Sequence, residues 1–160
     1  MKLCMRQKVF SWGDRFSVCD EAGNDRYFVE GELFSWGKKL HVVDATGREV
    51  AYIEQQILAF LPRYEVYVAG TLVATVSRRF SFFTPRYTLE ASDGADWEVE
   101  GELWEHEYTV RRGEQTVVSI AKEWFTFGDF YALDIRDPAD ELRAVALVLA
   151  IDCAVEQQNS

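Results

Sequence analysis

The segment from Leu142 to Ile151 constrains the fold more than any other, because it is apolar around its whole circumference. Apart from Arg143, every residue in it is Leu, Val, Ala or Ile. A helix that is apolar on all faces must be buried on all sides, in a protein core or in lipid. Its uninterrupted apolar part, about eight residues, covers only ~12 Å, against ~30 Å for the hydrocarbon core of a bilayer. We therefore expect a buried core helix that does not span a membrane.

The start of this helix is marked by Asp137 and Pro138. Aspartate is a favoured N-cap, and proline suits the first helical position, where its missing N–H is not needed. Asp140 and Glu141 then place carboxylates in the first turn, where the helix dipole favours them. These signals predict a core helix over about residues 138–154.

Residues of about 8–135, by contrast, form short runs in which apolar and polar side chains alternate. Between Trp97 and Leu103, for example, glutamates occupy positions 98, 100 and 102. This period of two is typical of antiparallel strands with one solvated face. The runs are separated by hairpin turns at Asp20–Asn24, Asp44–Gly47, Ala69–Gly70, Asp93–Gly94 and Arg112–Gly113. Counting the runs predicts about twelve strands, the first of them near Val9.

Internal repeats indicate how these strands are arranged. Residues 29–33 and 99–103 share the sequence Val-Glu-Gly-Glu-Leu, and Pro-Arg-Tyr occurs at both 62–64 and 85–87. A period near seventy residues is too long for a solenoid, whose units run to about 50 residues, and is better explained by two similar halves of one closed sheet. A barrel of about twelve strands is too wide for its own side chains to fill, so the apolar helix is expected to fill it. We predict one domain over residues 1–160, a mostly β fold in which a closed antiparallel barrel surrounds the C-terminal helix.

Beyond this general pattern, the chain resembles a known family. The succession of short strands, the segment Lys122–Tyr131 that leads into the last of them, and the apolar helix closing in Ala150-Ile151-Asp152 resemble the LURP-one-related proteins. These belong to the Tubby C-terminal-like group, together with phospholipid scramblases. The resemblance covers nearly the whole chain and implies a twelve-stranded β-barrel around a central helix. Within the group it also implies lipid as a candidate partner, since Tubby-like domains bind phosphoinositides through basic surface residues.

Charge and cysteine content narrow the classes of partner and compartment. With 17 basic and 27 acidic side chains the net charge is −10, which repels nucleic acid and disfavours anionic membranes except at a local basic patch. Cys4, Cys19 and Cys153 are odd in number and lack ligand spacing, which argues against a disulfide framework and a structural zinc site. Lysines and arginine interrupt the first nine residues, so no signal peptide is expected there. We predict a cytoplasmic protein.

No catalytic signature stands out. The chain contains no GxSxG, HExxH, Walker or GxGxxG pattern. Glu105-His106-Glu107 offers metal-ligand residue types, but in a strand the two glutamates would face away from the histidine, so we expect surface charge there. His41 is expected to point to solvent, and Glu100 and Glu102 to belong to a solvated acidic face. We therefore predict no catalytic residues, no metal site and no cofactor.

The densest basic grouping is the best candidate for a binding site. Arg78 and Arg79, together with Arg63 and Arg86 of the two Pro-Arg-Tyr repeats, lie close in sequence to Phe80, Phe82 and Phe83. Cationic groups beside exposed rings would suit an anionic lipid headgroup or a phosphorylated ligand. The alternative is that Phe80 and Phe82 pack in the barrel while the arginines pair with surface glutamates, and this alternative is the one the pattern favours.

Three aromatic segments, Phe10–Gly13, Phe34–Gly37 and Trp124–Gly128, each end a predicted strand with glycine. We expect them to line one end of the barrel and to stack over the end of the helix, closing the barrel rather than forming a small-molecule mouth. The function that follows is a non-enzymatic cytoplasmic binding or scaffold protein for an unidentified protein or small ligand. An anionic-lipid or phosphoinositide binder is the second hypothesis, and an uncharacterised enzyme is the third.

Overall fold

The computed structural model describes residues 1–8, 15–32, 36–125 and 128–158. The strands are β1 (Lys2–Lys8), β2 (Arg15–Asp20), β3 (Asp25–Gly31), β4 (Lys39–Asp44), β5 (Glu49–Gln55), β6 (Arg63–Val68), β7 (Thr71–Arg79), β8 (Arg86–Ala91), β9 (Trp97–Glu102), β10 (Glu107–Arg112), β11 (Gln115–Phe125) and β12 (Gly128–Ile135). Two short 3-10 helices, η1 (Leu103–Glu105) and η2 (Pro138–Asp140), and one α-helix, α1 (Glu141–Gln158), complete the chain.

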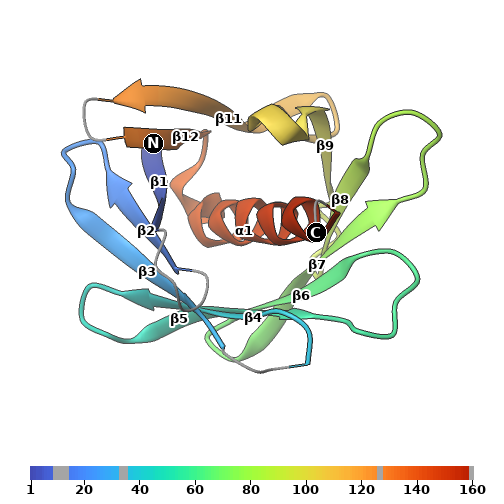
Figure 1. The fold of residues 1–160 in the computed structure, drawn as a ribbon, viewed down its shortest axis with the longest axis horizontal. Coiled ribbons are helices and arrows are strands. Elements are labelled where there is room, and N and C mark those ends of the chain that lie inside the picture. Colours follow the sequence, from blue (N-terminus) through green and yellow to red (C-terminus); the bar gives the residue numbers. More distant parts are fainter. Residues whose placement is uncertain (9–14, 33–35, 126–127, 159–160) are drawn as a thin grey trace.

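Each strand pairs antiparallel with its sequence neighbours, and β1 pairs with β12 to close the barrel. Helix α1 runs through the interior (Figure 1). The predicted architecture, a closed antiparallel β-barrel around a C-terminal helix, is therefore confirmed.

The start of the barrel was predicted wrongly. We expected the first strand near Val9, which lies outside the described residues, whereas β1 begins at Lys2 and pairs with both β12 and β2. Its alternation is present in the sequence, because Leu3 and Met5 are buried while Cys4 and Arg6 are not. Lys2 and Arg6, which the sequence analysis used only to argue against a signal peptide, alternate with the buried Leu3 and Met5 along this strand.

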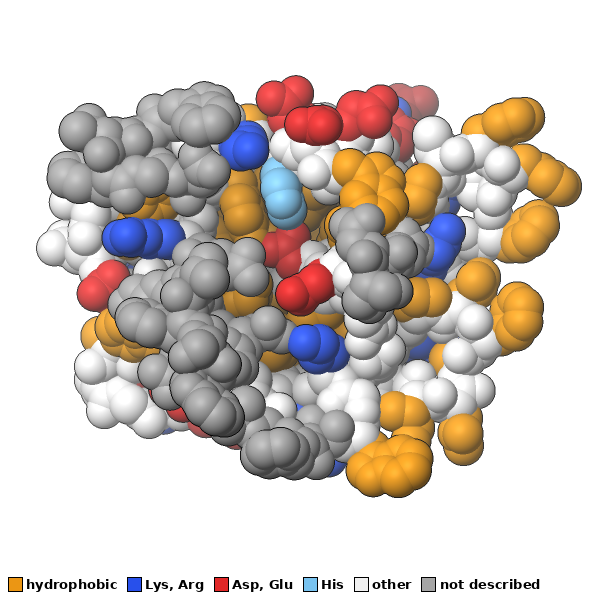
Figure 2. Space-filling model, in the orientation of Figure 1, with side chains coloured by type: hydrophobic (Ala, Val, Ile, Leu, Met, Phe, Trp, Pro, Cys, Tyr) orange, Lys and Arg blue, Asp and Glu red, His pale blue; other side chains and the backbone are white. Residues whose placement is uncertain are grey.

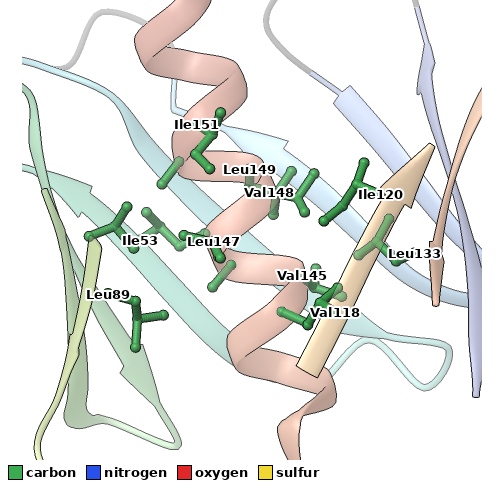
Figure 3. Close-up of a cluster of buried hydrophobic side chains, with 14 of the residues drawn as sticks. Ile53, Leu89, Val118, Ile120, Leu133, Val145, Leu147, Val148, Leu149 and Ile151 are labelled. Carbon is green, nitrogen blue, oxygen red and sulfur yellow. The ribbon is translucent and has the colours of Figure 1, made fainter. Parts of the chain in front are cut away.

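The core consists of the inward side chains of the strands packed against all faces of α1. Residues Ala144 to Ile151 are completely buried. Figure 3 shows Ile53 and Leu89 on one side of the helix and Val118, Ile120 and Leu133 on the other. A helix that is apolar all round is thus solvated on none of its faces, as its composition requires.

Polar contacts anchor the first turns of the helix. The Asp137 side chain accepts a hydrogen bond from the Ala139 amide (3.0 Å), with Pro138 at the first position of η2, and η2 leads directly into α1. The predicted start of the helix is confirmed, and the helix continues about one turn beyond the predicted end. Three ion pairs then tie this end of the helix to the barrel wall: Arg26 with Glu141, Arg112 with Asp140 (2.7 Å), and Arg143 with Asp93 (2.9 Å).

The two ends of the barrel differ in character. Because consecutive strands run antiparallel, the links between them alternate between the ends. In the β2–β3, β4–β5 and β8–β9 links, Asp20, Asp44 and Asp93 accept hydrogen bonds from backbone amides of their own turns. We call this the aspartate end; helix α1 begins there. The opposite end holds the β1–β2, β3–β4, β5–β6, β7–β8, β9–β10 and β11–β12 links, and we call it the aromatic end.

The internal repeats relate different pairs of strands. The Val-Glu-Gly-Glu-Leu copies begin in β3 and β9, which are six strands apart in a barrel of twelve, as two similar halves require. The Pro-Arg-Tyr copies instead lead into β6 and β8, only two strands apart. The second repeat therefore reflects a recurring hairpin rather than a half of the barrel.

The buried helix gives a direct test of this architecture. Leu147 is fully buried among the strands, and an isolated carboxylate there would cost several kcal/mol, comparable to a typical total stability of about 5–15 kcal/mol. We expect Leu147→Asp to abolish cooperative unfolding in thermal melts followed by circular dichroism. Leu72→Asp, at an exposed position of β7, is the matched control and should melt within a few degrees of the wild type. A cooperative melt of Leu147→Asp would contradict the central position of α1.

Candidate functional site

Large apolar side chains are exposed almost entirely at the aromatic end. Among the residues that the structure describes, those with substantial exposure are Trp36, Ile57, Leu58, Phe60, Leu72, Phe80, Phe82, Phe83 and Trp104. All but Leu72 lie in links at the aromatic end. In Figure 2 hydrophobic side chains gather along the right edge, over the β5–β6 and β7–β8 links of Figure 1.

The most exposed of these side chains have almost no protein around them. Phe60 is 99% exposed, Phe83 97% and Leu58 96%. Phe80 and Phe82 contact each other edge-to-face with ring centroids 5.2 Å apart, and both remain largely exposed. The expectation that Phe80 and Phe82 pack inside the barrel is therefore wrong. The alternating pattern of β7 ends at Arg79, and the rings that follow belong to the link.

The β5–β6 and β7–β8 links contain no charged side chain and are bordered by arginine. Residues 55–62 and 80–85 contain no Asp, Glu, Lys or Arg. Arg63 opens β6, Arg78 and Arg79 close β7, and Arg86 opens β8. We call the two links with these four arginines the arginine–aromatic rim.

The two links of the rim are joined at their bases. The Arg78 amide donates a hydrogen bond to the Pro62 carbonyl (2.9 Å). Above this contact lies a shallow groove of about 320 Å³, lined by Ala59, Phe60, Leu61, Pro62, Arg63, Ser77, Arg78, Arg79 and Phe80. The predicted arginines are thus brought together with the aromatic side chains of both links, although Arg86 is not among the residues lining the groove.

The four predicted arginines are not equivalent. Arg79 donates to Thr88 Oγ1 (3.0 Å) and pairs with Glu90, so the expected pairing with surface glutamate holds for this one residue. Arg63, Arg78 and Arg86 form no ion pair with any other described residue. Three guanidinium groups at the rim therefore keep their charge available for a ligand.

The aromatic segments expected to close the barrel can be placed only in part. Residues 10–13, 34–35 and 126–127, as well as the side chains of 124, 125 and 128, lie outside the described residues. Of these segments, the structure describes Trp36 and Gly37, which lie in the β3–β4 link at the aromatic end. Trp36 is 83% exposed, however, so its ring does not stack over the end of the helix.

His106 is in a different environment from the one the sequence predicted. It follows η1 in a left-handed conformation (φ 54°) instead of lying in a strand. Its ring stacks on Tyr131 with centroids 4.7 Å apart, and Nδ1 lies 3.4 Å from Oδ1 of Asp152 near the end of α1. The Tyr131 hydroxyl donates to the same carboxylate. No pattern in the sequence indicates this contact, because Asp152 lies 46 residues further along the chain.

A row of inward tyrosines lines one side of the barrel wall beside the last turns of α1 at the aromatic end. They are Tyr64, Tyr87, Tyr108 and Tyr131, one on each even-numbered strand from β6 to β12, and all are buried. The Tyr64 hydroxyl donates to Oε1 of Gln157 (3.5 Å), and the Gln157 side-chain amide pairs with that of Gln55 (3.0 Å). Burial raises the pKa of Tyr64, Tyr108 and Tyr131, so these hydroxyls stay protonated. Their spacing of 23, 21 and 23 residues was the signal that could have revealed them.

The other candidate residues form surface contacts. His41 lies between Glu49 and Glu32 on the outer wall and packs on Tyr52, partly exposed as predicted. Glu98, Glu100 and Glu102 are exposed, as expected for a solvated face. Within the described residues, no group of three or more His, Cys, Asp or Glu side chains is arranged to hold a metal ion. In the same part of the chain, no helix is long and apolar enough to cross a bilayer.

Comparisons with known proteins agree with this architecture. The family model described as LURP-one-related matches residues 1–152, and the chain belongs to that family. The uncharacterized protein YxjI of Bacillus subtilis (strain 168) is 34% identical over 152 residues, covering 95% of this chain and 92% of its own. The X-ray structure of an Arabidopsis thaliana protein has the same fold, with a TM-score of 0.64 at 20% identity over 94% of this chain and 90% of that one.

The contact between His106 and Asp152 predicts a pH dependence of stability. The Asp152 carboxylate raises the pKa of His106, and Glu105 adds to this rise. Partial burial and Lys122 oppose it. Tyr131 and Tyr108 are the neutral groups nearby. Because the folded-state pKa is raised, the imidazolium stabilises the fold fully below the unfolded pKa of about 6.5 and this contribution is lost as pH rises through the folded pKa.

We therefore expect His106→Gln to lower the free energy of unfolding more at pH 6 than at pH 9, measured by urea denaturation. His41→Gln, which removes the imidazole on the outer wall, is the control. Adding His106→Gln to this variant should again lower the free energy of unfolding more at pH 6 than at pH 9. A deficit of His106→Gln that grows toward pH 9 would contradict the assigned contact.

Proposed function

We propose that this protein is a non-enzymatic, cytoplasmic binding protein that docks its arginine–aromatic rim onto an anionic lipid surface. One observation carries the proposal: the exposed large apolar side chains gather at one end of the barrel, on uncharged links bordered by arginine. Scattered exposed apolar residues are normal on a soluble protein, but a gathering of them marks a surface that is covered in use.

The two kinds of side chain suit the two layers of a membrane surface. Burial of an exposed Leu or Phe side chain is worth about 1.5–3 kcal/mol, which the link tips would gain by entering the interface. An arginine near an anionic leaflet contributes about 1 kcal/mol. Arg63, Arg78 and Arg86 stand at the bases of the links, where phosphate groups would lie once the tips are inserted.

The net charge of −10 orients the molecule rather than preventing its binding. Exposed charges act over a Debye length of about 8 Å at physiological salt, so an anionic surface responds to the charges of the end that faces it. Asp20, Asp44 and Asp93 lie at the aspartate end. Repulsion there favours approach by the rim.

The exposure of individual tips favours lipid over a protein partner. Phe60, Phe83 and Leu58 stand almost free of neighbours. A bilayer interface accepts separate apolar side chains without a matching shape, whereas a protein partner must provide a pocket for each. Binding to a protein instead of lipid is the alternative outcome of the experiments below.

The apolar tips give the first test. We expect Phe60→Ser/Phe83→Ser to weaken co-sedimentation with vesicles of phosphatidylcholine and phosphatidylserine by about 100-fold or more, since two rings lose at least ~3 kcal/mol of burial. Leu72→Ser removes the exposed apolar side chain outside the aromatic end and should bind like the wild type. Equally weak sedimentation of the wild type with neutral and anionic vesicles would refute the proposal and direct attention to protein partners.

The arginines give the second test. Arg63→Gln is expected to reduce binding to the same anionic vesicles about fivefold at low salt, and less at physiological salt, as expected for ~1 kcal/mol of screened attraction. Arg79→Gln changes the net charge equally but removes a guanidinium already paired with Glu90, so its effect should be smaller. Equal effects of the two variants would show that only net charge matters and would count against a defined rim.

A further inference from the structure

Cys4 and Cys19 face each other across β1 and β2. They are direct partners in the strand register, and the Cys19 thiol donates to the Cys4 carbonyl oxygen (Sγ–O 3.5 Å). Both are reduced and partly exposed. We propose that this pair is a redox modification site, at which exchange with a low-molecular-weight disulfide forms a reversible cross-strand disulfide.

The strand geometry allows the bond without moving the backbone. Directly opposed residues of antiparallel strands have Cα atoms about 4.5 or 5.5 Å apart, and both values lie within the ~4.4–6.8 Å found for disulfides. Their neighbours Leu3, Met5 and Val18 are buried in the core, so both cysteine side chains lie on the outer wall. Cys153 is buried on the core helix and cannot compete as a partner.

The surroundings distinguish the two thiols. Burial raises the pKa of both thiols. The pKa of Cys19 rises to about 11, because the neighbouring Cys4 adds to the effect of burial. At Cys4 the Cys19 thiol and the Lys2 ammonium lower the pKa, while Glu123 and Glu21 raise it. Cys4 is therefore the attacking sulfur and Cys19 the resolving one.

The exchange is balanced as follows. The Cys4 thiolate attacks one sulfur of the small disulfide, forms a mixed disulfide and expels one small thiolate. The Cys19 thiolate then attacks the Cys4 sulfur, which forms the Cys4–Cys19 bond and expels the second small thiolate. The two protons from the protein thiols end on the two released small thiols. The protein loses two electrons, and the small disulfide gains them.

The product would clamp the strand that closes the barrel. β1 pairs with β12 on one side and with β2 on the other, so a bond to β2 fixes the N-terminal strand in the wall. A cross-link of this kind restricts the unfolded chain and thereby stabilises the fold. The effect does not depend on the rim, so lipid binding and disulfide formation can fail separately.

The experiment uses the full chain and oxidised glutathione at pH 8.5. We expect intact mass spectrometry to show the loss of two hydrogens, peptide mapping to place the bond between Cys4 and Cys19, and the melting temperature to rise by several degrees and fall again with dithiothreitol. Cys153→Ser should behave identically. Cys19→Ser should stop at a glutathione mixed disulfide on Cys4.

Two results would overturn the assignment. One is a wild type that retains glutathione on Cys4 or Cys19 without closing the bond. The other is oxidation that yields only dimers linked between chains. Since both side chains lie on the outer wall, the serine variants are expected to fold, and a melting curve of the reduced proteins checks this before oxidation.

Discussion

The structure depends on the burial of one helix that is apolar on every face. A barrel of about eight strands is nearly filled by its own side chains, and one of twelve needs something inside it. Helix α1 supplies that filling, and the barrel in turn supplies the apolar environment that the helix needs. Each part buries apolar surface that the other would otherwise leave exposed to water. The order of the chain is consistent with this, since the helix follows directly after the last strand.

The polar anchors of the helix determine which way it points. Asp140, Glu141 and Arg143 pair with residues of the wall at the aspartate end, so the last turns of α1 reach the aromatic end. There the side chains of Gln157 and Asp152 contact Gln55, the Tyr64 hydroxyl and the His106 imidazole. The last turns of the helix are thus held at that end by side chains from inside the barrel.

Periodicity in the sequence was sufficient for the architecture but not for the positions where strands end. A period of two and an all-apolar run predicted the barrel, its closure around α1 and the start of the helix. The same period could not show that Phe80 and Phe82 lie beyond β7, since a link with alternating rings resembles a strand. Contacts between distant segments were also missed. His106 meets Asp152 only because the barrel brings η1 to the end of α1, while Cys4 and Cys19, equally spaced about the β1–β2 link, could have been paired from a hairpin.

Among the described residues, the exposed tips of the rim take no part in the contacts that hold the last turns of α1. Residues that closed the barrel would have to be buried, and Leu58, Phe60 and Phe83 are instead almost completely exposed. Such exposure is unfavourable in water and gives the fold nothing in return, whereas the turns of the aspartate end are polar and satisfy their own backbone amides. The turns at the aspartate end are therefore stabilised by their own hydrogen bonds, whereas the links of the rim expose apolar side chains to water. This difference between the two ends supports the proposal that the rim is covered in use.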